Sequence, residues 1–248
     1  MDSAFATAAP ALIVGGYSPL PIAPAGDNAW SPKGKEPGLE LRSGGNAEWI
    51  RMRSWQIFCA RQPHAKTIAV WSKYPDAGVG VACGFGGLVA VDIDDEALVE
   101  PLLAVLPRVL VAKRGRKGLT AFFRATETLP SKNYRSTDKR GLLDFLSGGK
   151  QTVLPPTKHP VTGRPYEWTT ERTLLDTPIA ELPALTSAHH AALEDVLAVY
   201  GWSPPEGPES RSDTFQNVRS PQDRAPYDGA FLSAVRIARA QWLRELKL

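Results

Sequence analysis

The chain has 248 residues, of which 43% are hydrophobic and 22% charged, and this composition is typical of a globular protein. Its two cysteines, Cys59 and Cys83, have no near partner in sequence, which argues against a disulfide framework or a zinc knuckle and fits a reducing cytoplasm. The formal charge of +3 permits nucleic-acid binding without demanding it. No apolar run is long enough to span a membrane, and the apolar start at Ala4–Val14 lacks the basic segment of a signal peptide.

The first quarter of the chain is predicted to hold one strand and two helices. Residues 15–45 are rich in glycine and proline, which predicts a loop after a short strand near Leu12–Val14. Asn46 is a favourable helix N-cap, and the helix formers that follow predict a helix over Ala47–Arg61. A second, short helix is expected near Thr67–Lys73.

The middle of the chain is dominated by predicted strands. Short apolar runs between turn residues predict strands at Val79–Cys83, Leu88–Ile93, Val109–Lys113, Leu119–Arg124, Leu142–Leu146, Thr152–Leu154 and Tyr166–Trp168. An amphipathic stretch from Asp95 to Leu106 predicts a helix, with acidic residues at its start where the helix dipole favours them. The basic turn at Arg114–Gly118 is expected to join two of the strands as a hairpin.

The character of the chain changes after about residue 183. Helices are predicted over His189–Tyr200 and over the apolar-striped segment Asp228–Leu248. Between them, Pro204–Pro226 is polar and rich in proline, as linkers are. The sequence therefore predicts a main domain over 1–183 and a helical extension over 184–248, with a linker at about 203–226.

A glycine-started apolar strand, Gly87–Val91, runs into the carboxylates Asp92 and Asp94. Residues two apart in a strand point to the same side, so these two carboxylates would project together. Carboxylates so close repel each other and favour a shared cation, and hard divalent ions prefer oxygen ligands. The pattern suggests a metal site for phosphoryl or nucleotidyl transfer, and a polar turn at the end of a surface strand is the alternative. Asp95 would face the other side and start the next helix.

Two later features add to this hypothesis. Asp144 interrupts the predicted strand Leu142–Leu146, where aspartate is unusual, and it would act as a third metal ligand or face outward on an edge strand. The turn residues Arg114, Arg116 and Lys117 would either neutralise a substrate or form a solvated loop tip.

The order of these motifs resembles the primase-polymerase domain of the archaeo-eukaryotic primase superfamily, as found in phage and plasmid replication proteins. That family has a strand ending in D-x-D or D-x-E, a hairpin whose polar residue helps to hold the nucleotide, and a third aspartate on a later strand. A glycine-rich turn then leads to a P-P-[ST]-x-H segment and an aromatic close. In this chain Asp92 and Asp94 correspond to the D-x-D motif and Asp144 to the third aspartate. Pro155–His159 matches the P-P-[ST]-x-H segment and Tyr166–Trp168 the aromatic close, and the resemblance covers about residues 12–170.

The resemblance implies an α+β fold, with an RRM-like mixed or antiparallel catalytic sheet, a smaller N-terminal α/β unit and C-terminal helices. Residues 1–183 would be the catalytic domain, with the site in the cleft between its two parts. The implied reaction is metal-dependent, template-directed nucleotidyl transfer in DNA replication, with Mg²⁺ or Mn²⁺ as cofactor. Asp92, Asp94 and Asp144 would be the catalytic metal ligands. Residues expected at the nucleotide are Arg116, Lys117, Thr120, Lys150 and His159, and those expected at nucleic acid are Arg114, Lys132, Arg135 and Arg140.

The sequence departs from the family in the hairpin. Many members carry a histidine there, in a G-x-H setting, whereas Thr120 follows Gly118-Leu119 in this chain. A threonine hydroxyl can bond a phosphate oxygen but carries no positive charge. Arg116 and Lys117 could supply that charge, or His159 could take the histidine's role.

The remaining aromatic and histidine residues are expected to be structural. Trp49, Trp55 and Trp71 are predicted to lie in the core rather than to stack on bases, and His64, His189 and His190 to lie at the surface.

Two other functions remain as alternatives, a metal-dependent nuclease on a similar fold and a nucleic-acid-binding replication factor without catalysis. Retention of all three aspartates argues against the second. Expected partners are a DNA template and primer strand, nucleoside triphosphates of either sugar type, and no membrane. Because Gly148-Gly149-Lys150 is followed by Gln151, no phosphate-loop motif is present, and a replicative helicase is expected in trans. The expected location is the cytoplasm of a prokaryotic cell, with the gene on a phage or plasmid.

Overall fold

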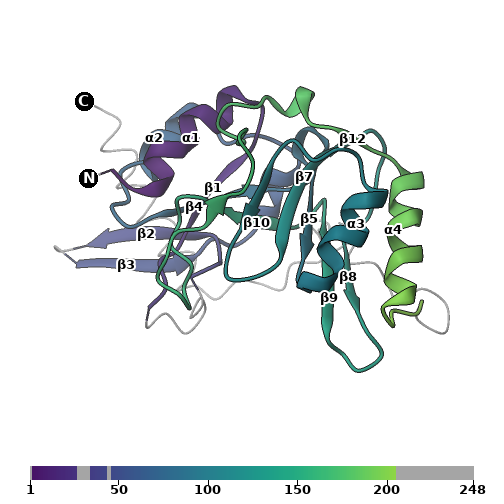
Figure 1. Ribbon diagram of the computed structural model, residues 1–248. Coiled ribbons are helices and arrows are strands. Elements are labelled where there is room, and N and C mark those ends of the chain that lie inside the picture. The colour runs from purple at the N-terminus through teal and green to yellow at the C-terminus, as the bar shows by residue number, and fades with distance from the viewer. Residues whose placement is uncertain (1, 27–33, 44–45, 205–248) are drawn as a thin grey trace, which may run out of the picture. The chain divides into compact units, whose positions relative to one another are not determined.

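The structure is a computed structural model that describes residues 2–26, 34–43 and 46–204, and it confirms the predicted α+β class (Figure 1). The predicted linker from residue 205 onward and the predicted helix Asp228–Leu248 lie outside the described residues. The helices are α1 (Ala4–Val14), α2 (Ala65–Trp71), α3 (Val99–Val105) and α4 (Ser187–Val199). Short 3-10 turns are η1 (Trp55–Cys59), η2 (Phe85–Gly87), η3 (Glu96–Leu98) and η4 (Ile179–Glu181).

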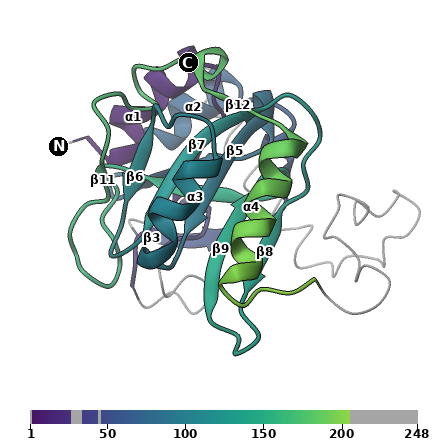
Figure 2. The same ribbon diagram turned by 45° about the vertical axis from the view of Figure 1, so that its right-hand side comes forward.

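A large, mainly antiparallel sheet has the strand order β11-β6-β7-β5-β9-β8, with β12 parallel to β7. Its strands are β5 (Leu88–Ile93), β6 (Ala112–Arg114), β7 (Leu119–Ala125), β8 (Lys132–Arg135), β9 (Gly141–Leu146), β11 (Glu167–Trp168) and β12 (Ala184–Leu185). Helices α3 and α4 lie over one face of this sheet (Figure 2). The central strand β5 turns Val89, Val91 and Ile93 toward that helical layer, and Leu88 and Ala90 toward the other face.

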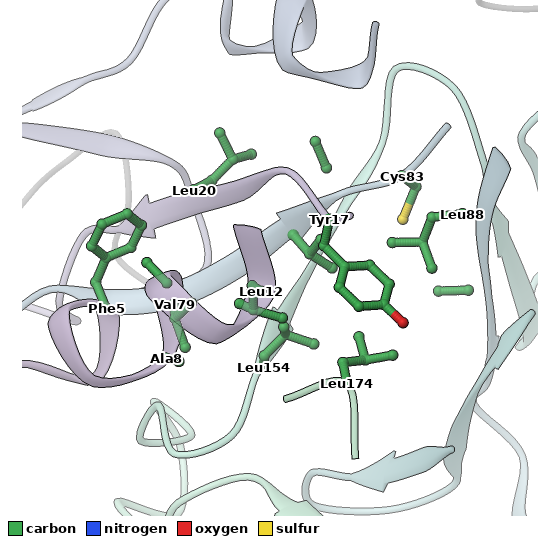
Figure 3. Packing of buried hydrophobic residues seen from close by; sticks show 14 of the residues in the cluster. Phe5, Ala8, Leu12, Tyr17, Leu20, Val79, Cys83, Leu88, Leu154 and Leu174 are labelled. Carbon is green, nitrogen blue, oxygen red and sulfur yellow. The ribbon is translucent and has the colours of Figure 1, made fainter. Parts of the chain in front are cut away.

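A smaller sheet, in the order β1-β4-β10, combines β1 (Pro19–Ile22), β4 (Gly78–Ala82) and β10 (Gln151–Leu154). Helix α1 packs on β1 and β4, and Leu12, Leu20 and Val79 are fully buried between them (Figure 3). This core is continuous with the inner face of the large sheet, because Leu88 belongs to the same apolar cluster. The face of β5 that carries Leu88 and Ala90 therefore packs toward the N-terminal part of the fold. Asp92 lies two residues beyond Ala90 and is on the same face.

The predicted helix over Ala47–Arg61 is wrong. Strands β2 (Gly38–Ser43) and β3 (Asn46–Arg51) instead form an antiparallel pair, in which Trp49 lies opposite Glu40. The Trp49 ring packs edge-on against Tyr74, with ring centroids 5.5 Å apart. Aromatic and branched side chains fit a half-buried strand, and this tertiary packing outweighs the helix propensity of the segment. Trp55 lies in η1, not in a long helix, and Trp71 is buried as predicted.

The predicted strand near Leu12–Val14 is also wrong, because these residues end helix α1. The hydroxyl of Ser3 accepts a hydrogen bond from the backbone N–H of Ala6 at 3.2 Å and caps the helix. The run of alanines favours a helix strongly enough to accommodate Pro10 inside it. Strands β1, β2, β3, β8 and β12 were not predicted, and β1 and β2 lie within residues 15–45, which were predicted as a loop. The strands predicted from Val79 to Trp168 are all present, with ends shifted by a few residues.

Helix α4 is the helix predicted at His189–Tyr200, and it packs closely on the large sheet. Leu193 and Leu197 are fully buried in the same apolar cluster as Val89 of β5. The predicted division of the chain at residue 183 stays a prediction. None of the helices in the described ranges combines the length and apolarity needed to cross a bilayer.

Candidate active site

A row of polar side chains crosses the large sheet at right angles to its strands. Residues directly opposite one another on β6, β7, β5, β9 and β8 are, in that order, Lys113, Thr120, Asp92, Asp144 and Asn133. Asp94 follows Asp92 by two positions, and its backbone N–H continues the ladder by donating to the carbonyl of Leu142 at 3.0 Å. The sheet register therefore brings all three predicted carboxylates to one face.

Hydrogen bonds join the members of this row. The Lys113 ammonium donates from Nζ to Oγ1 of Thr120 at 3.0 Å, and the Thr120 hydroxyl donates to Oδ1 of Asp92 at 2.6 Å. An ammonium can only donate and an ionised carboxylate can only accept, so the direction of this chain of bonds is fixed. On the other side, Nδ2 of Asn133 donates to Oδ1 of Asp144 at 2.6 Å.

The carboxylates act on one another electrostatically. Burial raises the pKa of Asp94, and the neighbouring negative charge of Asp92 raises it further. Burial also raises the pKa of Asp144, an effect that its hydrogen bond from Asn133 opposes and that Asp94 and Asp92 reinforce. Within the described residues, no three carboxylate, histidine or cysteine side chains stand as a ready-made set of metal ligands. The three carboxylates repel one another, and a cation bound between them would relieve that repulsion.

A cavity of about 500 Å³ opens over this row. Most of the predicted catalytic and nucleotide-binding residues line it, namely Asp92, Asp94, Asp144, Arg116, Lys117, Thr120 and His159. The lining also includes residues to which the sequence analysis gave no role, among them Lys35, Lys113, Gln151 and Tyr166. Acidic and basic side chains therefore share one cavity, which suits a substrate carrying both bound cations and phosphates.

The basic hairpin between β6 and β7 is held by Glu96 of η3. Its Oε2 accepts the backbone N–H of Gly118 at 2.7 Å, and its Oε1 pairs with Nη2 of Arg114 at 2.9 Å. Gly118 has φ +66°, and a Cβ there would lie 1.9 Å from the carbonyl oxygen of Ile93, so only glycine fits. This contact presses the turn against the end of β5 and leaves Arg116 and Lys117 over the cavity.

His159 reaches the cavity from the segment that follows β10. Its Nδ1 accepts the backbone N–H of Val161 at 3.2 Å, and its ring lies 5.2 Å from that of Tyr166. Burial lowers the pKa of His159, and the positive charge of Lys35 lowers it further. Thr157 of the same segment, by contrast, serves the fold, because its hydroxyl accepts the backbone N–H of Val79 at 2.7 Å.

The residues predicted to contact nucleic acid do not join this group. Arg114 pairs with Glu96, Lys132 with Glu194 at 2.7 Å, and Arg140 with Asp95. Arg135 donates to the carbonyl oxygen of Lys139. Lys150, predicted to bind nucleotide, is also outside the cavity lining, and its backbone carbonyl accepts from the N–H of Cys83.

One of the histidines expected at the surface is part of the packing instead. His190 of α4 lies half-buried, with Nε2 3.0 Å from the hydroxyl of Tyr134 and its ring 4.7 Å from that of Phe145. Lys132 lies 4.6 Å from the ring centroid of Trp202. These contacts bind β8 to α4 and hold the strand that carries Asn133.

Sequence reasoning missed Lys113 and Asn133 because their positions depend on strand register. Lys113 shares a face with Thr120 only because the hairpin pairs these two residues directly. Asn133 lies on β8, a strand that the sequence presented only as a basic run. A four-residue turn over Gly115–Gly118, one residue shorter than the predicted turn, would have placed Lys113 opposite Thr120.

The family model for the bifunctional DNA primase/polymerase N-terminal domain, Prim-Pol, matches residues 9–185. This match covers most of the chain and all the residues that line the cavity, so the chain belongs to the Prim-Pol family. No curated protein matches the chain. Membership places the chain among nucleotidyltransferase-type enzymes of DNA replication, which act on DNA and nucleotides.

Proposed function

We propose that this domain catalyses metal-dependent, template-directed nucleotidyl transfer, as primer synthesis, DNA polymerisation or both. The observation that carries the proposal is the convergence of Asp92, Asp94 and Asp144 in one cavity that is also lined by cationic side chains. The three carboxylates would hold divalent metal ions in this cavity, and the basic side chains would face the phosphates of a nucleotide.

The donor set fits Mg²⁺ or Mn²⁺. These ions prefer oxygen ligands, and repulsion among the three carboxylates favours a cation between them. Asp92, Asp94 and Asp144 would hold the ions, which when bound would lower the pKa of an attacking 3′-hydroxyl and stabilise the leaving pyrophosphate. The bonds from Thr120 and Asn133 each occupy Oδ1 of their aspartate and fix how it is turned.

Other side chains would handle the substrate. Arg116 and Lys117 on the turn, together with Lys35 of the same cavity lining, would neutralise the triphosphate by charge-assisted hydrogen bonds. His159 has its Nδ1 engaged by backbone N–H groups, so its Nε2 would be the atom to meet a phosphate oxygen or the sugar. Holding the nucleotide and the primer end together is the larger part of the catalysis expected of such a site.

An assay on a primed template and on an unprimed single strand tests this function. Wild-type protein with labelled nucleotides and Mg²⁺ or Mn²⁺ should extend the primer or make one, and the double variant Asp92→Asn/Asp94→Asn should not. Asp76→Asn, at an exposed position away from the cavity lining, is the matched control and should behave as wild type. Shortening of the labelled DNA without incorporation would indicate the nuclease alternative, and equal behaviour of wild type and double variant would indicate a non-catalytic factor.

The expected partners of the reaction are a DNA template, a primer strand and nucleoside triphosphates. That a replicative helicase acts together with this domain stays a prediction from the sequence. Its phage or plasmid origin and its prokaryotic cytoplasmic location stay predictions from the sequence.

A further inference from the structure

Lys113 places its amino group in the interior of the site, where burial lowers the pKa of that group and the negative charge of Asp92 opposes the change. Its side chain belongs to a residue only 3% exposed, although lysine is rarely buried so fully without an ionic partner. Across the part of the chain that the structure describes, no carboxylate forms an ion pair with its ammonium. Its polar partner is the hydroxyl of Thr120, which takes one of the three N–H donors of the ammonium.

The surroundings of Lys113 favour an anion as the missing partner. Its Nζ lies 5.0 Å from the ring centroid of Tyr166, and the nearest acidic group in the row, Asp92, is separated from it by Thr120. A buried charge without an ionic partner is unfavourable, so a site that retains one is suited to a ligand that completes it. Lys113 lines the cavity, so a ligand can reach it.

We propose that Lys113 is the buried cation that binds the triphosphate of the incoming nucleotide, with Thr120 holding its ammonium in place. This inference rests on the proposed function, and it names a nucleotide-binding residue for that same site. In such a reaction the triphosphate of the nucleotide is the polyanion that binds both to the basic side chains and to the metal ions held by the carboxylates. Arg116 and Lys117 lie on the turn, whereas Lys113 is shielded from water, so its attraction for phosphate is screened less.

The same contacts link nucleotide binding to the first carboxylate. Because Lys113 donates to Thr120 and Thr120 donates to Asp92, the ammonium, the hydroxyl and the carboxylate form one ordered chain of bonds. Removing the charge of Lys113 should weaken nucleotide binding more than it slows the reaction at saturating nucleotide. Removing the hydroxyl of Thr120 should affect both, because it also frees Asp92 to turn.

The test uses Lys113→Met, which keeps a long, unbranched side chain without the charge, and Lys113→Arg, which keeps the charge. Binding of inorganic tripolyphosphate to the whole chain is measured by calorimetry and by the rise in melting temperature, with Mg²⁺ present. Lys113→Met should bind about tenfold or more weakly, since it loses a charge-assisted contact. Lys113→Arg should retain part of the affinity, and Lys66→Met, at an exposed position on α2, should bind as wild type.

Folding of the variants is checked by the melting temperature without ligand. Replacing an unpaired buried charge by an apolar side chain should leave that temperature unchanged or raise it, so weaker binding would not reflect unfolding. Tripolyphosphate binding by Lys113→Met at the wild-type level would overturn the inference, as would absence of binding by the wild type.

A steady-state assay separates this inference from the proposed function. If the wild type extends primers and Lys113→Met has the wild-type KM for nucleotide, the inference fails while the proposed function stands. If the wild type binds tripolyphosphate through Lys113 but transfers no nucleotide, the binding site stands and the proposed function fails.

Discussion

Asp92 and Asp144 lie directly opposite each other on the neighbouring antiparallel strands β5 and β9. Like charges in this position destabilise a sheet, and here burial and the charges of Asp94 and Asp92 raise the pKa of Asp144. The arrangement carries a cost in folding free energy that a bound cation would offset. A group of carboxylates that destabilises the metal-free protein and is stabilised by a bound cation is expected where the cation takes part in the function.

Asp144→Asn should therefore stabilise the free protein while lowering its activity. The amide keeps an oxygen to accept the bond from Asn133 and removes one of the opposing charges. We expect a gain of up to about 1 kcal/mol, seen as a rise of a few degrees in melting temperature in the absence of divalent ions. A lower melting temperature than wild type would contradict the claim that charge repulsion dominates at this pair.

The stabilising effect of Asp144→Asn should grow with pH. The folded-state pKa of Asp144 is raised, so the folded protein binds this proton more tightly than the unfolded chain. Stability from this group is fully present below the unfolded pKa of about 4 and is lost as pH rises through the folded pKa. Melting curves of wild type and variant should thus coincide more closely at low pH and separate as pH rises. Curves that separate by the same amount at every pH would contradict this.

Asn133→Ala should shift the pH dependence of the reaction. Asn133 lowers the pKa of Asp144 by donating to its carboxylate, so removing the amide should raise that pKa. The acidic limb of the activity profile should move to higher pH, because Asp144 must be ionised to bind a cation. A residue with only a structural role would lower activity at every pH alike and leave the limb in place.

Gly118→Ala should disrupt the hairpin that carries the basic turn. The added Cβ would lie 1.9 Å from the carbonyl oxygen of Ile93, and the backbone at φ +66° already disfavours a side chain. We expect a loss of more than about 2 kcal/mol by chemical denaturation, together with weaker nucleotide binding. Gly163→Ala is the matched control, because its φ is +67° and nothing lies within 4 Å of its Cβ position. Equal losses from the two substitutions would show that backbone strain alone decides the effect.

The carboxylates of the site could be predicted from sequence because their geometry is local. Asp92 and Asp94 share a face through strand alternation, and Asp144 interrupts an apolar strand, so each signal is contained within a few residues. The hairpin and the strands around it were predictable for the same reason.

The parts that escaped prediction depend on contacts between distant segments. The β2–β3 pair replaced an expected helix because Trp49 packs against Tyr74. Lys132 was assigned to nucleic acid, but Glu194, which pairs with it, is 62 positions away. The role inferred for Lys113 depends on its burial, which the surrounding basic sequence would not suggest.

The most direct test of the account is primer extension by the single variant Asp94→Asn, with nucleotide binding measured on the same preparation. If the three carboxylates hold the ions of a nucleotidyl transfer, the rate should fall by about 10²-fold or more while the protein stays folded and binds tripolyphosphate. Extension by Asp94→Asn at the wild-type rate, in Mg²⁺ and in Mn²⁺, would contradict the account.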